Sequence, residues 1–288
     1  MPNKKHIRLL KIVKTKIALD EQLQPYRSRG ARIAFVPTMG ALHQGHIMLI
    51  HHAKTLADIV VCSIFVNPTQ FNDPKDLEKY PRPIERDTAM LSEAQCDVLF
   101  HPEVDELYGL DEHWHLDLGR LDQVLEGSHR PGHFQGVTQV VKKLFDAVQP
   151  NIACFGQKDF QQYKVIEYMV EKLQLPVTLA LCPTVREPDG LAMSSRNVRL
   201  TEEGRKQALA LYRTLQYLRS SPNRDNLDVL RETAAAMLEN SPGVQLEYIA
   251  IYDAATFEET HEAEPGQQLI ALVAAWVDGV RLIDNMFL

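Results

Sequence analysis

The spacing of hydrophobic residues changes along this chain, and the change divides the chain into two parts. Up to about residue 182, short runs rich in β-branched residues alternate with segments whose apolar positions recur every three or four residues. Nearly continuous apolar runs are typical of parallel strands buried on both faces. We predict strands at 33–36, 59–65, 98–100, 152–155 and 177–182, and helices within 7–30, from about 45 to 56, and at 83–94, 136–148 and 160–173. In the first helix, Ile17, Leu19 and Leu23 are the candidate core positions.

Alternating strands and helices predict an α/β fold, with a Rossmann-like parallel sheet covered by helices on both faces. Ligands on such sheets bind outside the carboxyl ends of the strands. Four loops should therefore lie at one edge of the sheet, at residues 37–46, 66–72, 156–162 and 183–197. After the segment 66–71, a polar loop is expected to run on through Tyr-Pro-Arg-Pro at 80–83.

The alternation stops near residue 186, where the sequence Arg-Glu-Pro-Asp-Gly begins. We place a domain boundary here, giving a domain at 1–185 and a smaller C-terminal α+β domain at 186–288. In the second domain, Thr201 is a candidate N-cap for a helix ending near Ser220. A further helix at about 226–239 and strands at 246–252, 268–275 and 280–283 should follow. We expect this domain to act as a lid.

Composition and charge narrow the class of protein. The 288 residues are 45% apolar and 24% charged, as in ordinary soluble domains. A net charge of −7 argues against binding to nucleic acids or anionic membranes. The longest clean apolar run, 269–277, is too short to cross a bilayer, and the basic N-terminus lacks the apolar segment of a signal peptide. The cysteines form no C-x-x-C pair, which suits a reducing cytoplasm.

The segment 37–46, Pro-Thr-Met-Gly-Ala-Leu-His-Gln-Gly-His, carries the first candidate chemistry. Pro37 should end the strand, while Gly40 and Gly45 allow a ligand close to the backbone. Free N–H groups at the following helix start would favour a phosphate, and His43 and His46 could donate to it. The alternative is a polar turn or half of a metal site. The H-x-G-H pattern is similar to the signature of class I aminoacyl-tRNA synthetases and nucleotidylyltransferases, which act at the α-phosphate of a nucleoside triphosphate.

Two further segments could contact the same phosphates. Gly-Gln-Lys-Asp at 156–159 follows a strand, so Lys158 would present a point charge there. Asp159 could cap the next helix, accept from a ribose hydroxyl or hold Mg²⁺. Met-Ser-Ser-Arg at 193–196 could form an oxyanion clamp, in the place where class I enzymes carry a K-M-S-K-S loop. Taken alone, the same four residues would be an ordinary turn.

Two glutamines on the converging loops, Gln70 and Gln162, could bind a small substrate with hydroxyl and carboxylate groups. Solvated loop glutamines are the alternative. Weaker candidates of the same kind are Asn67, Arg130 and His133. The sequence offers no Ser-His-Asp or Cys-His arrangement and no zinc spacing, and the thiols of Cys62 and Cys154 should be inert inside strands.

Together these motifs closely resemble the pantothenate synthetase (pantoate–β-alanine ligase) family, over nearly the whole chain. The resemblance rests on the segments 37–46, 65–71, 130–137, 155–162, 186–197 and 281–285. One departure is Gln157, where the family usually has Glu. Compared with the family, Met1–Arg8 is a slight extension of the N-terminus, and we expect it to be disordered.

The resemblance implies an ATP-dependent ligation. Pantoate carboxylate attacks the α-phosphorus, giving pantoyl adenylate and pyrophosphate, and β-alanine then displaces AMP to form pantothenate. It further implies Mg²⁺ with the ATP phosphates, a homodimer, pantoate and β-alanine contacts from Gln70 and Gln162, and a proton-donor role for His46. With it, the catalytic candidates are His43, His46, Lys158, Ser194, Ser195 and Arg196. The implied ATP contacts are Met39, Gly40, Ala41, Leu42, His43, Gln44, Gly45, His46, Gly156, Gln157, Lys158, Asp159, Val185, Met193, Ser194, Ser195 and Arg196.

Two other functions would use part of this pattern. A nucleotidylyltransferase would keep the nucleotide on its product and need no acyl acceptor. A non-catalytic nucleotide sensor would use the phosphate contacts but leave Gln70 and Gln162 without a ligand. A tRNA synthetase is disfavoured by the acidic charge and by the lack of an anticodon-sized domain.

Overall fold

The computed structural model describes residues 9–71, 74–109, 112–222 and 226–288. The chain forms two compact units, one of residues up to Gly156 with Gln162–Cys182, the other of Gln157–Gln161 with Pro183–Leu288. The short segment Gln157–Gln161 thus groups with the C-terminal residues, although it directly follows a strand of the first unit. The domain division at 185/186 stays a prediction, and Met1–Arg8 lies outside the described residues.

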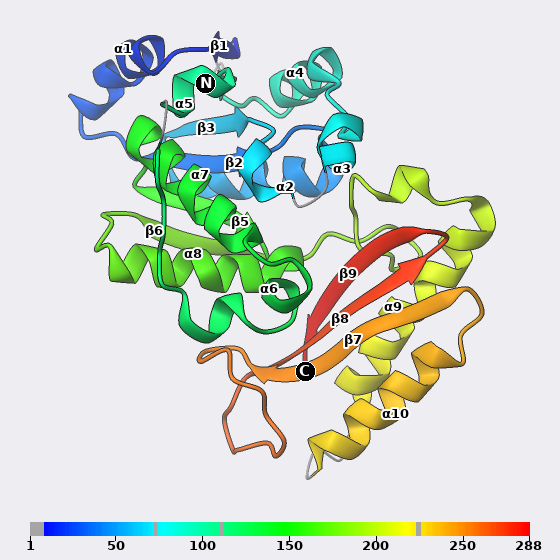
Figure 1. Ribbon diagram of the computed structural model, residues 1–288. Coiled ribbons are helices and arrows are strands. Elements are labelled where there is room, and N and C mark those ends of the chain that lie inside the picture. Colours follow the sequence, from blue (N-terminus) through cyan, green and yellow to red (C-terminus); the bar gives the residue numbers. More distant parts are fainter. Residues whose placement is uncertain (1–8, 72–73, 110–111, 223–225) are drawn as a thin grey trace, which may run out of the picture. The chain divides into compact units, whose positions relative to one another are not determined.

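In the described part of the first unit, a parallel sheet of six strands has the order β1-β4-β3-β2-β5-β6 (Figure 1). Five of the strands lie where the hydrophobic pattern predicts them. The edge strand β1 is missed because its three residues, Lys-Ile-Val, are too few to show a period. The strands are β1 (Lys11–Val13), β2 (Ile33–Thr38), β3 (Ile59–Ile64), β4 (Val98–Phe100), β5 (Ile152–Gly156) and β6 (Thr178–Cys182).

Alternate residues of the central strand β2 enter two separate hydrophobic clusters, as the period of two in a strand requires. Ile33 and Phe35 pack with residues of α1, α7 and α8, whereas Ala34 and Val36 pack with residues of α2 and α4. The two clusters confirm the predicted α/β fold with helices on both faces of the sheet (Figure 1). The long helices are α1 (Lys16–Arg27), α2 (Gln44–Leu56), α4 (Ile84–Glu93), α7 (His133–Val148) and α8 (Phe160–Lys172).

Short helical turns occupy the loops at the carboxyl edge and beyond. One of them lies in the segment 66–71 and one in the polar loop that was predicted to follow it, and three more lie within 101–135, for which the sequence predicts no element. Short polar helices of this kind lack the apolar repeat by which a sequence reveals a helix. They are η1 (Pro68–Gln70), α3 (Pro74–Lys79), α5 (Val104–Leu107), η2 (Gly119–Asp122) and α6 (Glu126–His129).

Three local predictions were wrong. Ile17, expected in the core, is 74% exposed, because only Leu19 and Leu23 of α1 face the sheet. Helix α7 begins at His133 rather than residue 136. Pro37 does not end β2, which pairs with β3 through Thr38, whereas its pairing with β5 covers only Ala34 and Phe35. The proline therefore lies where the strand is paired on one side, and its missing N–H interrupts no second ladder.

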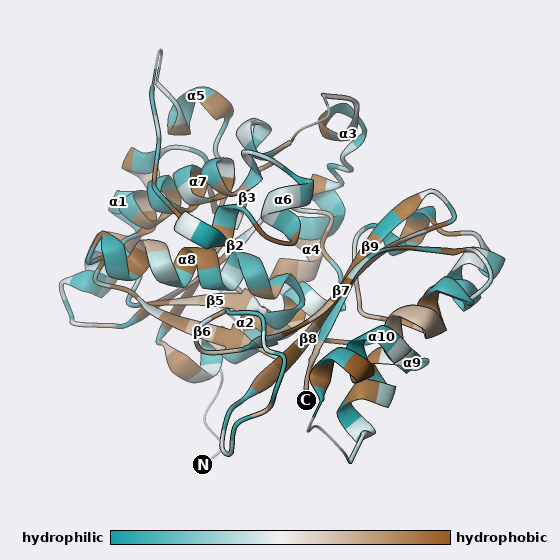
Figure 2. Ribbon diagram, turned by 60° about the horizontal axis from the view of Figure 1, so that its bottom comes forward, coloured by the Kyte–Doolittle hydropathy of each residue, from teal (hydrophilic) through white to brown (hydrophobic). Residues whose placement is uncertain are grey.

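In the second unit, the described residues form an antiparallel sheet in the order β7-β8-β9, with helices α9 and α10 packed on it. Both sheets carry much of the hydrophobic sequence (Figure 2). The predicted N-cap Thr201 accepts from the N–H of Gly204. This unit confirms the predicted α+β class. Its elements are η3 (Gln157–Asp159), η4 (Asn197–Arg199), α9 (Glu202–Ser220), α10 (Leu227–Glu239), β7 (Val244–Asp253), β8 (Leu269–Val277) and β9 (Val280–Phe287).

Candidate active site

The order of strands in the first unit locates the edge at which a ligand is expected. Strand β2 lies between β3 and β5, so the order of connections reverses beside it. Such a reversal opens a crevice at the carboxyl ends of the strands. The H-x-G-H loop begins at Met39, directly after β2, and Gly156 ends the neighbouring strand β5.

The two histidines of the loop hold each other in place at the start of α2. Nδ1 of His43 accepts from the N–H of Gly45 at 3.1 Å, and Nδ1 of His46 accepts from the N–H of His43 at 3.3 Å. The half-buried rings lie 4.1 Å apart between centroids. A ring nitrogen that accepts carries no proton, so in the neutral form of each ring the proton is on Nε2. Both imidazoles are thereby fixed as Nε2–H donors.

Contrary to the expectation from the sequence, the N–H groups of Gly45 and His46 at the start of α2 are not free, because they donate to Nδ1 and to the carbonyl of His43. Ala41 and Leu42 donate to the carboxylate of Asp87 at 2.7 and 2.8 Å, and Gly40 donates to the Thr38 hydroxyl at 3.2 Å. The N–H groups of His43 and Gly45 bond to the imidazoles described above. The loop is thus ordered by Asp87, by Thr38 and by its own histidines, and the imidazoles remain as its candidate groups for an anion.

Asp87, from helix α4, is a residue that the sequence patterns did not reveal. It is only 1% exposed, and burial raises the pKa of its carboxyl, against the two N–H donors that lower it. Gly40 has φ +82°, and a Cβ there would meet Asp87 Oδ2 and Ile64 at 3.0 Å. Glycine is required at this position both for the positive φ and for the close approach of the carboxylate.

Gln70 is buried in η1 at 8% exposure, so it is not a solvated loop residue. Its Oε1 accepts from Asn67 Nδ2 at 3.2 Å, and its Nε2 lies 3.1 Å from the sulfur of Met39. Asn67 is oriented in turn by the Tyr108 hydroxyl, which donates to Asn67 Oδ1 at 2.7 Å. Burial raises the pKa of Tyr108, which keeps this donor protonated. The chain of bonds fixes the NH₂ group of Gln70 as a donor on the side of Met39.

Two of the weaker candidates, Arg130 and His133, form a chain of hydrogen bonds that ends on the backbone of Gln70. Arg130 Nη1 lies 3.2 Å from His133 Nε2, and because arginine can only donate, that ring nitrogen accepts. The other nitrogen, Nδ1, therefore carries the proton and donates to the carbonyl of Gln70 at 2.9 Å. Arg130, His133 and Asn67 are thus placed to position Gln70. The second glutamine, Gln162, lies half-buried on helix α8 and not in a loop.

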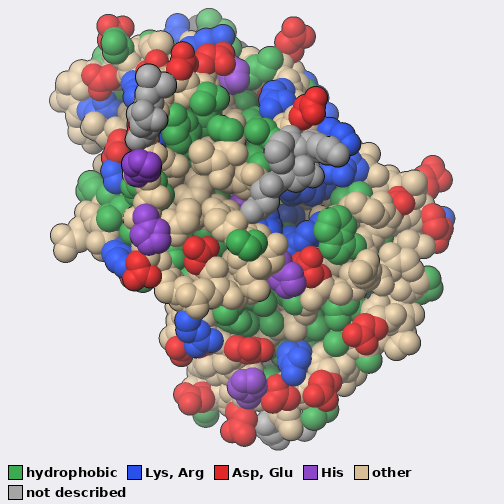
Figure 3. All heavy atoms as spheres, in the orientation of Figure 1, with side chains coloured by type: hydrophobic (Ala, Val, Ile, Leu, Met, Phe, Trp, Pro, Cys, Tyr) green, Lys and Arg blue, Asp and Glu red, His purple; other side chains and the backbone are tan. Residues whose placement is uncertain are grey.

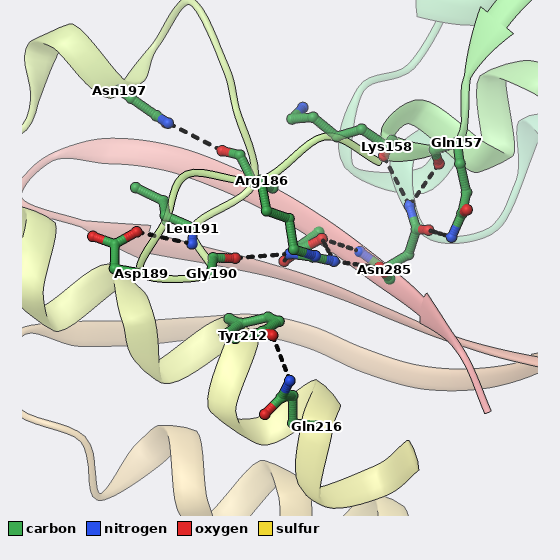
Figure 4. A network of polar contacts seen from close by, with 12 residues as sticks. Gln157, Lys158, Arg186, Asp189, Gly190, Leu191, Asn197, Tyr212, Gln216 and Asn285 are labelled. Carbon is green, nitrogen blue, oxygen red and sulfur yellow. Dashed lines mark hydrogen bonds and ion pairs between the residues drawn. The ribbon is translucent and has the colours of Figure 1, made fainter. Parts of the chain in front are cut away.

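In the second unit, η3 carries Lys158 and Asp159. Their charged groups lie 3.6 Å apart, with Lys158 mostly buried and Asp159 half exposed. The backbone of this turn is held by Asn285 of β9, whose Nδ2 donates to the carbonyls of Gln157 and Lys158 at 2.8 and 2.9 Å (Figure 4). Gln157 Nε2 returns a bond to Asn285 Oδ1 at 3.1 Å.

The segment before Met193 is anchored to the same strand. Arg186 makes a bidentate pair with the buried Asp284, at 2.6 and 2.9 Å, and also donates to the carbonyls of Gly190 and Asn285 (Figure 4). Its guanidinium lies 4.8 Å from the ring centroid of Tyr212. Burial raises the pKa of Asp284, and Arg186 opposes that rise.

The predicted clamp follows as a tight, half-buried turn. Ser194 Oγ accepts from the N–H of Arg196 at 3.2 Å, and its carbonyl accepts from the N–H of Asn197. Val185 is tied to the start of this turn, because its carbonyl accepts from the N–H of Met193 at 3.0 Å. Val185, Met193, Ser194, Ser195 and Arg196 therefore belong to one continuous loop of the second unit.

Three further features bear on the chemistry that these residues can perform. Burial raises the pKa of the Cys62 and Cys96 thiols, so these two groups are poor nucleophiles. Among the described residues, no three or more His, Cys, Asp or Glu side chains gather as a metal site. In the same part of the chain, no helix is both long and apolar enough to cross a membrane.

Comparison with known proteins places these features in one family. Residues 11–287 match the family described as pantoate-beta-alanine ligase. The pantothenate synthetase of Cytophaga hutchinsonii is 46% identical over 256 residues, which are 88% of this chain and 90% of the relative. That of Thermotoga neapolitana is 44% identical over 282 residues, covering 97% of this chain and 100% of the relative.

Solved structures agree. Pantothenate synthetase from Thermus thermophilus has a TM-score of 0.86 and 40% identity, covering 96% of this chain and 98% of that one. A pantoate-beta-alanine ligase from Francisella tularensis, complexed with beta-gamma ATP and beta-alanine, has a TM-score of 0.76 and 34% identity, covering 96% and 97%. With the sequence match running from the first strand to the last, this chain belongs to the pantoate–β-alanine ligase family.

Proposed function

We propose that this chain joins pantoate and β-alanine to form pantothenate, with ATP cleaved to AMP and pyrophosphate through a pantoyl adenylate. The observation that carries the proposal is the family match over residues 11–287, together with relatives of the same name over nearly the whole chain. The ordered H-x-G-H loop supports it, because this loop supplies two fixed imidazole donors for a triphosphate.

In the first step, a pantoate carboxylate oxygen attacks the α-phosphorus, and the bond to the β-phosphate oxygen breaks. Negative charge on the phosphate oxygens is stabilised by donors that are already oriented. We assign this role to the Nε2–H groups of His43 and His46, to Lys158, and to the loop bearing Ser194, Ser195 and Arg196. Pyrophosphate is a good leaving group, so hydrogen bonding by His46 can suffice without full proton transfer. The proposed ATP contacts are residues 39–46, 156–159, Val185 and 193–196.

Pantoate is assigned to the two glutamines. The oriented NH₂ group of Gln70 can donate to the carboxylate or a hydroxyl, and a ligand oxygen is a stronger acceptor than the Met39 sulfur that it faces. In the second step, the amine of β-alanine attacks the acyl carbon, AMP leaves, and the nitrogen loses a proton. Gln70 and Gln162 would hold the acyl group during both steps.

Mg²⁺ is proposed as a companion of ATP. Its usual sites combine one or two carboxylates with substrate phosphates, and the half-exposed Asp159 beside Lys158 fits such a set. Bound there, the ion would neutralise charge on the β- and γ-phosphates.

The attraction for ATP has to be local. The whole chain carries −7, and acidic side chains are spread over the face drawn in Figure 3. The cations and imidazoles named above would therefore supply the favourable potential for the triphosphate. We further propose a cytoplasmic location, which suits four buried free thiols, and a homodimer, as the family resemblance implies.

One assay tests the function. Purified protein is incubated with ATP, Mg²⁺, pantoate and β-alanine, and AMP, pyrophosphate and pantothenate are measured. Equal amounts of all three products are expected. Transfer of the nucleotide to a stable product without amide formation would favour a nucleotidylyltransferase. Binding of ATP without cleavage when pantoate is present would favour a nucleotide sensor.

A further inference from the structure

Strand β9 is far in sequence from the residues assigned to ATP. Two side chains of this strand nevertheless bond to the two segments of the second unit that contain those residues. Asn285 contacts the backbone of Gln157 and Lys158, and Asp284 contacts Arg186 at the base of the 186–197 loop. We propose that Asp284 and Asn285 are positioning residues that join the Lys158 turn and the 186–197 loop into one rigid phosphate-binding body. This inference rests on the proposed ATP site.

The carboxamide of Asn285 uses its full donor capacity on the Lys158 turn. Both N–H bonds of Nδ2 go to backbone carbonyls, at 2.8 and 2.9 Å, and Oδ1 accepts from Gln157 at 3.1 Å. Asn285 is 2% exposed and Gln157 is 9% exposed, so water has little access to these groups. Buried hydrogen bonds of this kind fix the turn in one geometry, because breaking them leaves the carbonyls unpaired.

Asp284 fixes the other loop in the same way. Its two oxygens receive the two terminal nitrogens of Arg186, and Arg186 bonds onward to the carbonyl of Gly190. A bidentate pair sets the orientation of both partners. Gly190 has φ +100°, and a Cβ there would meet the Tyr212 ring at 2.1 Å, so the loop is also seated closely against α9.

The two anchors are linked to each other. The N–H of Asn285 donates to Asp284 Oδ1 at 2.7 Å, and the carbonyl of Asn285 accepts from Arg186 at 3.1 Å (Figure 4). An unbroken series of bonds thus runs from Lys158 through Asn285 and Asp284 to Arg186. It explains why Gln157–Gln161 groups with the C-terminal unit although the preceding strand belongs to the other unit.

The structure therefore assigns Lys158 to the C-terminal body. Lys158 and the Ser194–Arg196 turn would meet the triphosphate in a spacing that β9 determines. Positioning of charged groups affects the charged transition state more than the binding of pantoate, which is assigned to residues of the other unit. A defect in β9 should consequently appear in ATP use and not in pantoate affinity.

The decisive variant is Asn285→Asp, which keeps the size of the side chain but turns the Nδ2 donor into an oxygen facing two carbonyls. Pantoate-dependent ATP–pyrophosphate exchange is measured with each substrate varied. We expect kcat/KM for ATP to fall by about ten- to a hundredfold, while the KM for pantoate stays within about twofold. Exchange at the wild-type rate, or equal losses for both substrates, would overturn the inference.

A matched control is Glu247→Gln, which removes a charge partly buried between β7 and β9, where Glu247 pairs with Arg281. It should leave both kinetic constants unchanged, because the bonds of Glu247 to Arg281 and Trp276 lie within the sheet and not on the Lys158 turn or the 186–197 loop. If Asn285→Asp fails to fold, Asn285→Ser decides, since it keeps one donor on a shorter arm. For Asn285→Ser we also expect a lower kcat/KM for ATP with an unchanged KM for pantoate. If the folded variant shows no such loss, the positioning role is refuted.

Hydrogen–deuterium exchange tests whether the two segments form one body. Asp284→Asn breaks the pair with Arg186 and does not remove either bond from Asn285 to the Lys158 turn. We expect faster exchange in residues 157–161 as well as in 186–197, with α10 unchanged. Faster exchange in 186–197 alone would show that the segments are independent. If the wild-type protein showed no pantoate-dependent ATP–pyrophosphate exchange, the proposed function itself would be refuted before any variant is compared.

Discussion

At the scale of single residues, the site is defined by which nitrogen of each side chain carries a proton. Backbone N–H groups occupy Nδ1 of His43 and of His46, so each neutral ring is left as an Nε2–H donor. The same reasoning makes the amide of Gln70 a donor, because Asn67 already occupies its oxygen. The groups proposed to meet phosphate and carboxylate are thus set as donors before any ligand binds, which reduces the reorganisation that catalysis would otherwise require.

Replacing His46 or Lys158 by alanine should lower the rate of adenylation by about two to three powers of ten, as expected for the loss of one oriented charge-stabilising donor. Single-turnover formation of pantoyl adenylate measures this step directly. Lys142→Ala is a suitable control, because Lys142 pairs with the exposed Asp146 on the surface of α7. A variant that forms adenylate at the wild-type rate would remove that residue from the mechanism.

The orientation of Gln70 gives a second prediction. Gln70→Ala should weaken pantoate capture and leave ATP affinity nearly unchanged. Tyr108→Phe should act in the same direction through Asn67, raising the KM for pantoate by about tenfold, the equivalent of one buried hydrogen bond. Tyr168→Phe removes a hydroxyl that accepts from the exposed Lys172 and serves as the control. Comparable losses for ATP and pantoate would contradict the assignment.

The residues that sequence reasoning could find are those whose type and local spacing carry chemistry. His43, His46, Lys158 and Gln70 stand in short motifs beside strand ends, and a pattern can show that. Asp87 and Asn285 act instead through bonds to backbone across 46 and 127 residues of sequence, and Asp284 acts through the Arg186 side chain across 98 residues. No local pattern marks such a partner, although Asp284 and Asn285 fall within one of the segments that carry the family resemblance.

At the scale of elements, helix α4 does more than cover the sheet. Its Asp87 reaches the loop after β2 and accepts from two consecutive N–H groups, so the helix holds the H-x-G-H loop in shape. The Asp87 carboxyl is buried in the first unit, and burial raises its pKa. The side chain that holds the loop is therefore less stable in its charged form than it would be in water. Activity and pH-dependent stability should therefore depend on the same side chain.

Asp87→Asn tests this role. Asparagine offers one acceptor where the loop presents two donors, so adenylation should fall by about tenfold. Because burial raises the folded-state pKa above the ordinary 3.8, the contribution of Asp87 to stability is fully present below that value and is lost as pH rises through the folded-state pKa.

Urea unfolding from pH 4 upward measures the second effect. The free energy of unfolding of the wild type, relative to Asp87→Asn, should decrease as pH rises and then become constant. Glu85→Gln, on the exposed side of the same helix, should show no such trend. A difference that increases with pH would mean that the ionised carboxylate is the more stable partner of the loop.

The elements themselves were predictable where burial imposes a period. Strands β2 to β6 and helices α4, α8, α9 and α10 follow from apolar spacing, and Thr201 from its capping chemistry. The period fails where polar groups are buried by specific bonds. Strand β9 was expected to end at residue 283, but it continues to Phe287 because Asp284 and Asn285 are paired inside the protein.

At the scale of the whole molecule, the residues named in the proposal fall in both compact units. His43, His46 and Gln70 belong to the first, whereas Lys158 and the 193–196 turn belong to the second. Each unit has hydrophobic clusters of its own, so each can respond separately to heat or to substitution. A ligand that contacts residues of only one unit would stabilise only that unit.

Calorimetry with a non-hydrolysable analogue of pantoyl adenylate can decide whether both units contribute. Leu215→Ala in the buried core of the second unit should cost about 2–5 kcal/mol and thereby identify the transition of that unit. At a hundredfold excess over its dissociation constant, the analogue should add about 2.7 kcal/mol of stability. If residues of both units bind one adenylate, neither can unfold without releasing it, so both transitions should move upward together. A shift confined to one transition would place the whole adenylate site within that unit.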